Sequence, residues 1–146
     1  MPSTLTPQAE VAALVEQIQS YAEAERKLVD QARGRLTQLK SEDCAIVLWG
    51  MATKGILFSF LVDPDCRLLD FCIDINPNKQ GCFVPVTGHA ISSVEALPRD
   101  SAQRLAVVVM NTNYLAEVAA TCRSRGLNPL FLNASGELLT PPTGTI

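Results

Sequence analysis

The chain has 146 residues, 47% of them hydrophobic and 18% charged, with a formal net charge of −3, as expected of one compact globular domain and not of a disordered protein. The slightly acidic balance, with no block of basic residues, argues against a nucleic-acid partner, and no apolar stretch approaches the roughly 20 residues that a membrane span needs. Since the N-terminus also lacks the basic and apolar pattern of a signal peptide, we expect a cytoplasmic protein without a membrane partner.

The first predicted element is a helix about 30 residues long. Thr6 is suited to the N-cap and Pro7 to the first helical position. The apolar residues that follow recur at spacings of three, four or several turns, which places on one helical face Val11, Leu14, Ile18, Tyr21, Leu28, Ala32, Leu36 and Leu39. A helix of this length must pack across its own domain, or pair with a second chain or another domain.

Beyond this helix, short apolar runs alternate with segments of helix length. The apolar runs predict four strands, at residues 44–49, 68–75, 105–110 and 128–132. The other segments predict helices at about residues 55–61, 92–97 and 114–125. A further extended piece is expected at 83–86, where Pro85 confines it to an edge of the sheet.

The strands are apolar throughout and do not alternate in polarity, which indicates a mainly parallel sheet covered on both faces. With right-handed crossovers, the predicted fold is α/β, a small Rossmann-like three-layer domain. The expected organisation is a long, linker-like helix in residues 1–42, the Rossmann-like domain in 43–135 and a loose tail in 136–146.

Polar residues and glycine gather in three of the predicted loops, at 50–54, 74–80 and 111–114. All three follow the carboxyl ends of strands, where ligands bind in sheets of this type. The sequence therefore predicts a ligand site at this edge of the sheet.

The first of these loops, Gly50-Met-Ala-Thr-Lys-Gly55, joins a strand to a helix but is not a dinucleotide fingerprint. The G-x-G-x-x-G pattern needs glycine where Ala52 stands, because a pyrophosphate must approach the backbone there. Lys54, near the helix start, can hold a phosphate or a carboxylate. The alternative is that the two glycines serve only a tight turn and that Lys54 is solvated.

The second loop begins at Asp74, 24 positions after Gly50. Rossmann domains place a carboxylate at this point to accept hydrogen bonds from ribose hydroxyls. Asp74 is equally suited to cap the turn that starts at Asn76. Lys79 and Gln80 follow in the same loop, where they either reach a ligand or are solvated.

The remaining polar candidates carry weaker signals. His89 is the only histidine, and it is interpreted as a hydrogen-bonded structural residue before a base. Tyr114 and Glu117 open a helix beside the ligand edge, and the helix dipole alone accounts for Glu117. No two of the five cysteines are spaced as Cys-x-x-Cys, so we expect structural or incidental thiols and no metal or redox site.

Four segments recur together in one known family. They are Trp-Gly-Met-Ala-Thr-Lys-Gly (49–55), Ile-Asp-Ile-Asn-Pro-Asn-Lys-Gln-Gly (73–81), Val-Thr-Gly-His-Ala-Ile (86–91) and Met-Asn-Thr-Asn-Tyr-Leu-Ala-Glu-Val (110–118). In this order they resemble the C-terminal domain of SAM-dependent sugar C-methyltransferases and related multidomain methyltransferases. The similarity covers roughly residues 45–135, and the second segment is its most specific part.

The resemblance implies an enzyme with a zinc-bearing N-terminal part, a central SAM-binding domain and this Rossmann-like domain, which helps to hold a nucleotide-sugar against the central domain. The sequence has no second glycine-rich strand–turn–helix for SAM, no cysteine cluster for zinc and no central domain with the family's catalytic base. The long helix occupies the place of the linker helix between the last two domains. We therefore expect no cofactor bound by this chain, SAM in a partner or missing domain, and no catalysis by this chain alone.

The ligand edge and the resemblance together give the candidate substrate-binding residues, with no catalytic residue and no metal ligand: Gly50, Thr53, Lys54, Gly55, Asp74, Asn76, Lys79, Gln80, His89, Asn111 and Tyr114. The first hypothesis is a methyltransferase-associated domain that binds or positions a nucleotide-sugar or other small polar substrate, with a methyltransferase domain as partner. The alternatives are a stand-alone domain that binds a nucleotide or cofactor, and an interaction module that dimerises through helix 7–40.

Overall fold

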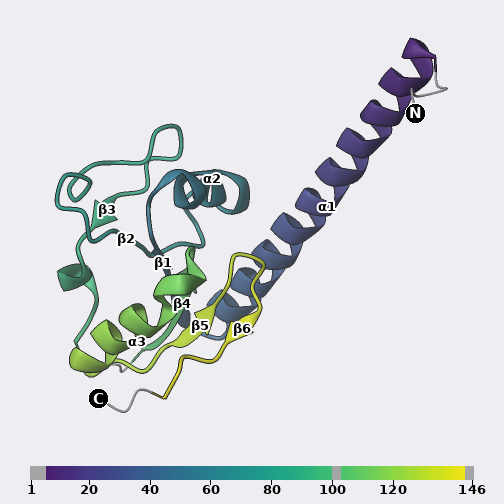
Figure 1. The fold of residues 1–146 in the computed structure, drawn as a ribbon. Helices are drawn as coiled ribbons and strands as arrows, with labels where there is room; N and C mark the ends of the chain where they lie inside the picture. Colours follow the sequence, from purple (N-terminus) through teal and green to yellow (C-terminus); the bar gives the residue numbers. More distant parts are fainter. Residues whose placement is uncertain (1–5, 100–102, 144–146) are drawn as a thin grey trace.

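A long helix precedes the sheet in the computed structural model, which describes residues 6–99 and 103–143 (Figure 1). This helix, α1 (Pro7–Ser41), begins as predicted. Thr6 Oγ1 accepts a hydrogen bond of 3.2 Å from the backbone N–H of Ala9, and Pro7 is the first helical residue. None of the helices in the described part is long and apolar enough to cross a membrane.

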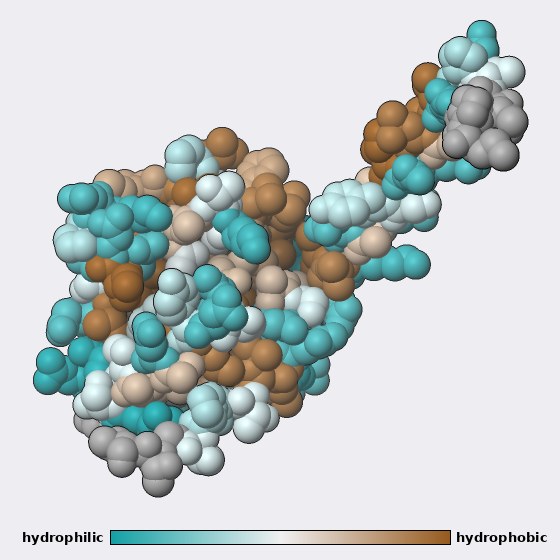
Figure 2. All heavy atoms as spheres, in the orientation of Figure 1, coloured by the Kyte–Doolittle hydropathy of each residue, from teal (hydrophilic) through white to brown (hydrophobic). Residues whose placement is uncertain are grey.

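Only the last third of α1 packs on the domain. Its buried residues are Ala32, Leu36 and Leu39, which lie three or four positions apart on one face. The preceding part projects from the domain over roughly 30 Å, and several of its hydrophobic side chains are exposed (Figure 2). The predicted hydrophobic face of α1 is therefore buried at its C-terminal end and exposed to solvent over the rest of the helix.

The described residues form a sheet with the strand order β3-β2-β1-β4-β5-β6, in which every neighbouring pair is parallel except β5 and β6. The strands are β1 (Cys44–Trp49), β2 (Phe71–Ile73), β3 (Ile91–Ser92), β4 (Arg104–Val109), β5 (Leu130–Leu132) and β6 (Leu138–Leu139). The two longest strands, β1 and β4, pair in the centre over their whole length. The predicted α/β fold with a mainly parallel sheet is confirmed.

Helices cover both faces of the sheet (Figure 1). On one face α1 and α2 (Thr53–Val62) pack against alternate β1 side chains such as Ile46 and Leu48. On the other face the remaining β1 residues, including Val47, contact α3 (Leu115–Ser124) and the 3₁₀ helix η1 (Val94–Ala96). A second 3₁₀ helix, η2 (Thr112–Tyr114), leads into α3. The uninterrupted hydrophobicity of β1 follows from these two cores.

The second strand is shorter than the predicted range 68–75. The backbone N–H groups of Leu68 and Leu69 donate to the carboxylate of Asp63, at 3.0 and 2.9 Å, and therefore do not pair in the sheet. The N–H of Asp70 reaches Ile46 in β1, and the regular strand starts only at the next residue. Hydropathy alone predicts that the strand starts at Leu68, but the carboxylate of Asp63 binds the backbone N–H groups there, so β2 starts later.

Two short strands were not predicted. β3 has two residues and pairs with β2, whereas the extended piece expected at 83–86 forms only an isolated bridge between Phe83 and Ala90. β6 lies within the predicted tail, 136–146, and pairs antiparallel with β5 through a turn in which Asn133 Oδ1 accepts from two backbone N–H groups. Residues 138–139 of the predicted tail thus belong to the sheet, and residues 144–146 lie outside the described part.

Candidate functional site

The loop after β1 turns tightly between two glycines. Gly50 has a φ of +106°, in the left-handed region that favours glycine, and its N–H donates to the Ile73 carbonyl at 2.8 Å. Gly55 lies in the first turn of α2, where a Cβ would stand 1.9 Å from the Gly50 carbonyl oxygen. The two glycines therefore allow a close backbone approach that brings the start of α2 over the ends of β1 and β2.

The N-terminus of α2 faces a pocket of about 820 Å³ at the carboxyl ends of β1, β2 and β4. Its N-cap, Ala52, supplies no side-chain acceptor, so the N–H groups of the first helical turn keep no capping partner from that residue. Lys54 is exposed in this turn and lines the pocket. The helix start and the lysine together favour an anionic group at this end of the pocket.

Six of the predicted residues line this pocket: Gly50, Lys54, Gly55, Asp74, Asn111 and Tyr114. Polar residues that the sequence analysis did not select lie beside them, namely Thr112, Asn113, Glu117 and Thr121. The helical spacing of Tyr114, Glu117 and Thr121 would have identified the last two, because residues three or four apart share one helical face. Five predicted residues do not line the pocket: Thr53, Asn76, Lys79, Gln80 and His89.

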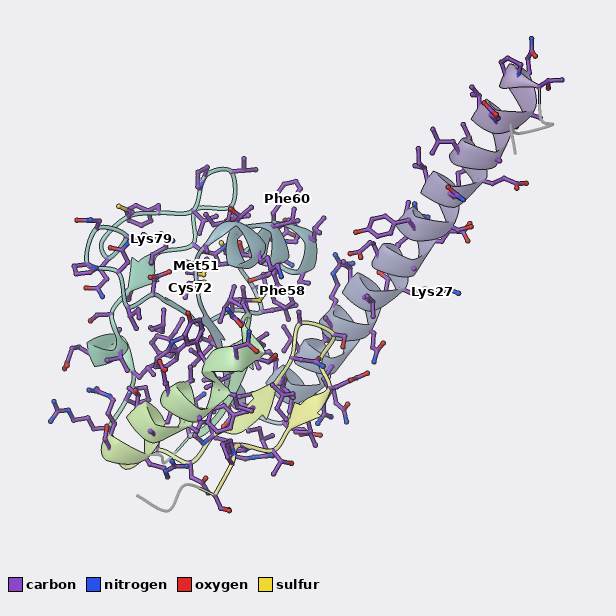
Figure 3. The ribbon with its side chains drawn as sticks, in the orientation of Figure 1. Lys27, Met51, Phe58, Phe60, Cys72 and Lys79 are labelled. Atoms are coloured by element: carbon purple, nitrogen blue, oxygen red, sulfur yellow. The ribbon has the colours of Figure 1, made fainter. Side chains whose placement is uncertain are left out.

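Asp74 lies at the pocket but is held within the protein. Its Oδ2 accepts a hydrogen bond of 2.8 Å from the Met51 N–H, and its Oδ1 accepts one of 2.8 Å from the Asn76 N–H. Lys79 Nζ lies 3.7 Å from Oδ2 and donates to the Met51 carbonyl at 3.2 Å (Figure 3). Gln80 donates to the Asp74 carbonyl at 2.9 Å. The second loop is thereby tied to the loop after β1.

Asn76 closes the second loop instead of facing the pocket. Its Oδ1 accepts from the Asn78 N–H at 3.0 Å, and its carbonyl accepts from the Lys79 N–H at 3.0 Å. These contacts form an Asx-type turn at Asn76 itself. The turn cap that was the predicted alternative for Asp74 is the hydrogen bond of 2.8 Å from the Asn76 N–H to Asp74 Oδ1.

His89 is nearly fully buried and lies away from the pocket. Its Nε2 is 2.9 Å from Asp63 Oδ2, and its Nδ1 is 2.7 Å from Thr87 Oγ1. Burial favours a raised pKa for Asp63, but hydrogen bonds from His89 and from the N–H groups of residues 67–69 outweigh it and lower that pKa. The geometry is that of a structural pair that fixes the chain between α2 and β2.

The third loop presents polar groups along the start of α3. Asn111 Oδ1 accepts from the Asn113 N–H at 3.1 Å and so caps η2. Tyr114 has 54% of its surface exposed, which leaves its ring available at the pocket wall. Glu117 follows one helical turn later and also lines the pocket. This side of the pocket offers amide and carboxylate groups that can bond hydroxyl-bearing ligands.

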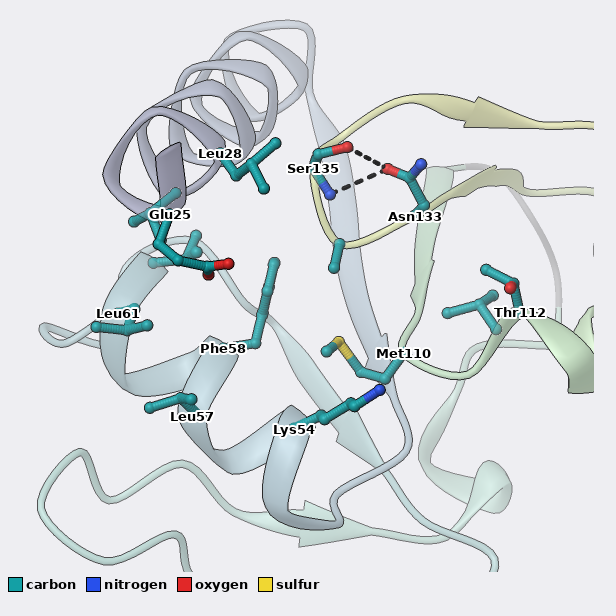
Figure 4. A pocket seen from close by; sticks show the side chains of 14 residues that line it. Glu25, Leu28, Lys54, Leu57, Phe58, Leu61, Met110, Thr112, Asn133 and Ser135 are labelled. Atoms are coloured by element: carbon teal, nitrogen blue, oxygen red, sulfur yellow. Dashed lines mark hydrogen bonds between the residues drawn. The ribbon is translucent and has the colours of Figure 1, made fainter. Parts of the chain in front are cut away.

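A second, smaller pocket of about 480 Å³ lies between α1, α2 and the turn that joins β5 to β6 (Figure 4). Apolar side chains such as Leu28, Leu57 and Phe58 dominate its lining. The pocket of about 820 Å³ at the ends of the strands, which we call the polar pocket, shares four residues with this apolar pocket: Lys54, Val109, Met110 and Thr112. The Lys54 side chain extends toward Met110, so its ammonium lies near the boundary between the two pockets (Figure 4).

The cysteines and acids form no metal site in the described ranges, where no group of three or more His, Cys, Asp and Glu side chains could hold an ion. Burial raises the pKa of Cys72 to about 12 and that of Cys122 to about 11. Both thiols therefore remain protonated at neutral pH and behave as small apolar groups in the core.

Comparison with known proteins gives one family. The family model described as the C-methyltransferase C-terminal domain matches residues 6–127, which include α1, all three loops and every residue that lines the polar pocket. No curated protein matches the chain.

Proposed function

Because the chain belongs to the family of C-methyltransferase C-terminal domains, we propose that it binds or positions a nucleotide-sugar substrate for methyl transfer by another domain or chain. The observation that carries this proposal is the position of Lys54. It lies in the first turn of α2, at a helix end without a side-chain cap, inside a polar pocket. A diphosphate is the group that this combination of fixed charge and free N–H donors favours.

The opposite wall of the pocket suits the rest of such a ligand. Asn111, Asn113 and Glu117 can bond sugar hydroxyls, and the exposed ring of Tyr114 can stack on a base or sugar. In the described part of the chain, Lys54 has no carboxylate within ion-pair distance, whereas Lys79 pairs with Asp74. Lys54 is therefore the cation of the pocket that is free to meet an anionic ligand.

Two features of the site support the proposal that SAM binds elsewhere. Asp74 occupies the position from which a Rossmann-type carboxylate would bond ribose hydroxyls, but it is nearly fully buried and both of its oxygens already accept backbone hydrogen bonds. The positive charge of Lys54 also opposes the sulfonium of SAM. We therefore assign SAM to another domain or chain and name no catalytic residue here.

The five cysteines of the chain are free in the structure, which supports the proposal of a reducing, cytoplasmic location. We also infer that the domain works beside a methyltransferase domain, on the basis of the family to which it belongs.

Titration calorimetry of the whole chain tests this function with four probes: UDP-glucose, dTDP-glucose, SAM and S-adenosylhomocysteine. We expect saturable binding of at least one nucleotide-sugar and no binding of SAM or S-adenosylhomocysteine. Binding of SAM alone would contradict the proposal and favour a stand-alone cofactor domain. A chain that binds none of the four at millimolar concentration would also contradict it.

A further inference from the structure

The exposed hydrophobic side chains are concentrated on two helices. Of the fourteen large ones in the described part of the chain, six lie on α1 and three on α2. The nine are Val11, Leu14, Val15, Ile18, Tyr21, Leu28, Leu57, Phe60 and Leu61. Hydrophobic residues follow the projecting helix and gather again over α2 in the same view of the molecule (Figure 2). We call these nine side chains the α1–α2 surface.

Five of the six exposed hydrophobic residues of α1 follow a heptad spacing, and the sixth, Val15, lies beside them. Intervals of three and four alternate along Val11, Leu14, Ile18, Tyr21, Glu25 and Leu28. This is the a/d pattern of a helix that packs against one other helix, interrupted once by an acid. The charged residues Glu16, Glu23, Arg26 and Lys27 fall outside that seam. The projecting half of α1 therefore has the sequence of half a coiled coil.

The seam leads directly into the domain. Its next position after Leu28 is Ala32, which is fully buried against the sheet. At the point where the seam becomes exposed, Leu28 and the α2 residues Leu57 and Leu61 line the same apolar pocket (Figure 4). A second helix laid along the seam would therefore end on α2.

We propose that the α1–α2 surface is the interface of an antiparallel homodimer, in which the projecting half of each α1 packs along the other and its tip rests on α2 of the second copy. In this register Ile18 lies opposite Tyr21 of the second copy, and Val11 lies opposite Leu28. Glu25 lies opposite Leu14 of the second copy. A parallel pair would set Glu25 against its own equivalent, which repels, and would place both domains at the same end.

The available area agrees with a stable dimer. The nine side chains are between 38% and 68% exposed. Together they offer roughly 700 Å² of apolar side-chain surface per copy, close to the about 800 Å² per partner of an ordinary specific interface. A two-fold arrangement suits this surface because each copy contributes both the helical seam and the α2 patch that receives it. None of the nine side chains lines the polar pocket, although Lys54 lies between that pocket and the apolar pocket beside the interface. The test of the dimer needs no ligand, so its outcome is separate from that of the proposed function.

Analytical ultracentrifugation of the whole chain tests the dimer. We expect the unmodified chain to be a dimer at micromolar concentration, and Ile18→Glu to raise the dissociation constant at least about 100-fold because it buries an unpaired charge. Gln19→Glu adds the same charge on the neighbouring, polar side of the helix and should leave the dimer intact. Thermal unfolding of each variant by circular dichroism reports whether the domain, which does not contact these residues, stays folded.

The orientation is tested at residue 14. Leu14→Lys places a cation opposite Glu25 of the second copy in the antiparallel register, whereas Leu14→Glu places an anion there. We expect the lysine variant to dimerise at least about tenfold more tightly than the glutamate variant. Equal weakening by both substitutions would overturn the antiparallel arrangement. A chain that stays monomeric at several hundred micromolar, or a dimer that survives Ile18→Glu, would overturn the proposal and assign the surface to a different polypeptide.

Discussion

The backbone N–H of Met51 donates a hydrogen bond of 2.8 Å to Asp74 Oδ2 and so joins the loop after β1 to the end of β2. The same carboxylate also accepts from the N–H of Asn76 and pairs with Lys79. Asp74, which stands where a Rossmann-type domain has a ribose-binding carboxylate, thereby links the two loops through hydrogen bonds; we call this set of contacts the Asp74 brace. We therefore expect removal of the Asp74 carboxylate to lower the stability of the protein more than it weakens the binding of a ligand.

Asp74→Asn tests this brace. An amide can accept at only one of its two positions, so one of the two N–H donors loses its acceptor and meets an NH₂ group. We expect the free energy of unfolding, measured by urea denaturation, to fall by about 1–3 kcal/mol. Asp65→Asn, at an exposed position, is the matched control and should change it by less than about 0.5 kcal/mol. Equal effects of the two substitutions would contradict the brace.

The glycine pair in the first loop gives a second prediction. In Gly55→Ala the new Cβ would stand 1.9 Å from the Gly50 carbonyl oxygen, and backbone must move to accommodate it. We expect a loss of about 3 kcal/mol or more in unfolding free energy. Gly34→Ala provides the contrast, because nothing lies within 4 Å of its Cβ in α1, and it should stabilise the protein by about 0.5–1 kcal/mol. Differential scanning calorimetry checks both predictions: the melting temperature should fall for Gly55→Ala and rise for Gly34→Ala.

The sequence predicts those parts of the structure that a local residue pattern determines, and not those that depend on contacts between distant parts of the chain. β1 and β4 are predicted to within one residue because burial on both faces makes them apolar throughout. β3 has no local signal, since its two residues become a strand only by pairing with β2. The edge of the sheet that carries the pocket follows from the strand–helix alternation alone. That Lys79 reaches Met51 depends on a tertiary contact across 28 residues, which no local pattern contains.

Asp63 gives a pH dependence with a definite sign. Although burial opposes it, the hydrogen bonds from His89 and three backbone N–H groups lower the pKa of Asp63 below that of an unfolded aspartate, about 3.9. The stability that this carboxylate contributes is therefore complete above about pH 4 and is lost as the pH falls through the lowered value. Asp63→Asn should be less stable at pH 7 and show a weaker loss of stability between pH 5 and pH 3. Urea titrations that gave both proteins the same acid dependence would contradict this assignment.

The thiols should divide into two classes. Cys66 and Cys82 are exposed, whereas Cys44, Cys72 and Cys122 are buried. Desolvation raises the pKa of the three buried thiols and also that of Cys66, so exposure to the reagent is what divides the two classes. Titration of the native chain at pH 8 with a disulfide reagent should modify two thiols rapidly and the other three only after denaturant is added. Rapid modification of Cys72 in the native protein, located by mass spectrometry of peptides, would contradict the packing of β2.

Binding of a nucleotide-sugar to Lys54→Ala is the most direct measurement of the proposed function. Because a charge-assisted contact to a phosphate contributes about 1.5–3 kcal/mol, calorimetry should show affinity for the nucleotide-sugar about 10- to 100-fold weaker than that of the unmodified chain. Lys27→Ala removes the same charge from the exposed part of α1 and should bind as the unmodified chain does (Figure 3). Unchanged binding by Lys54→Ala, or equal losses in the two variants, would contradict a diphosphate at the start of α2.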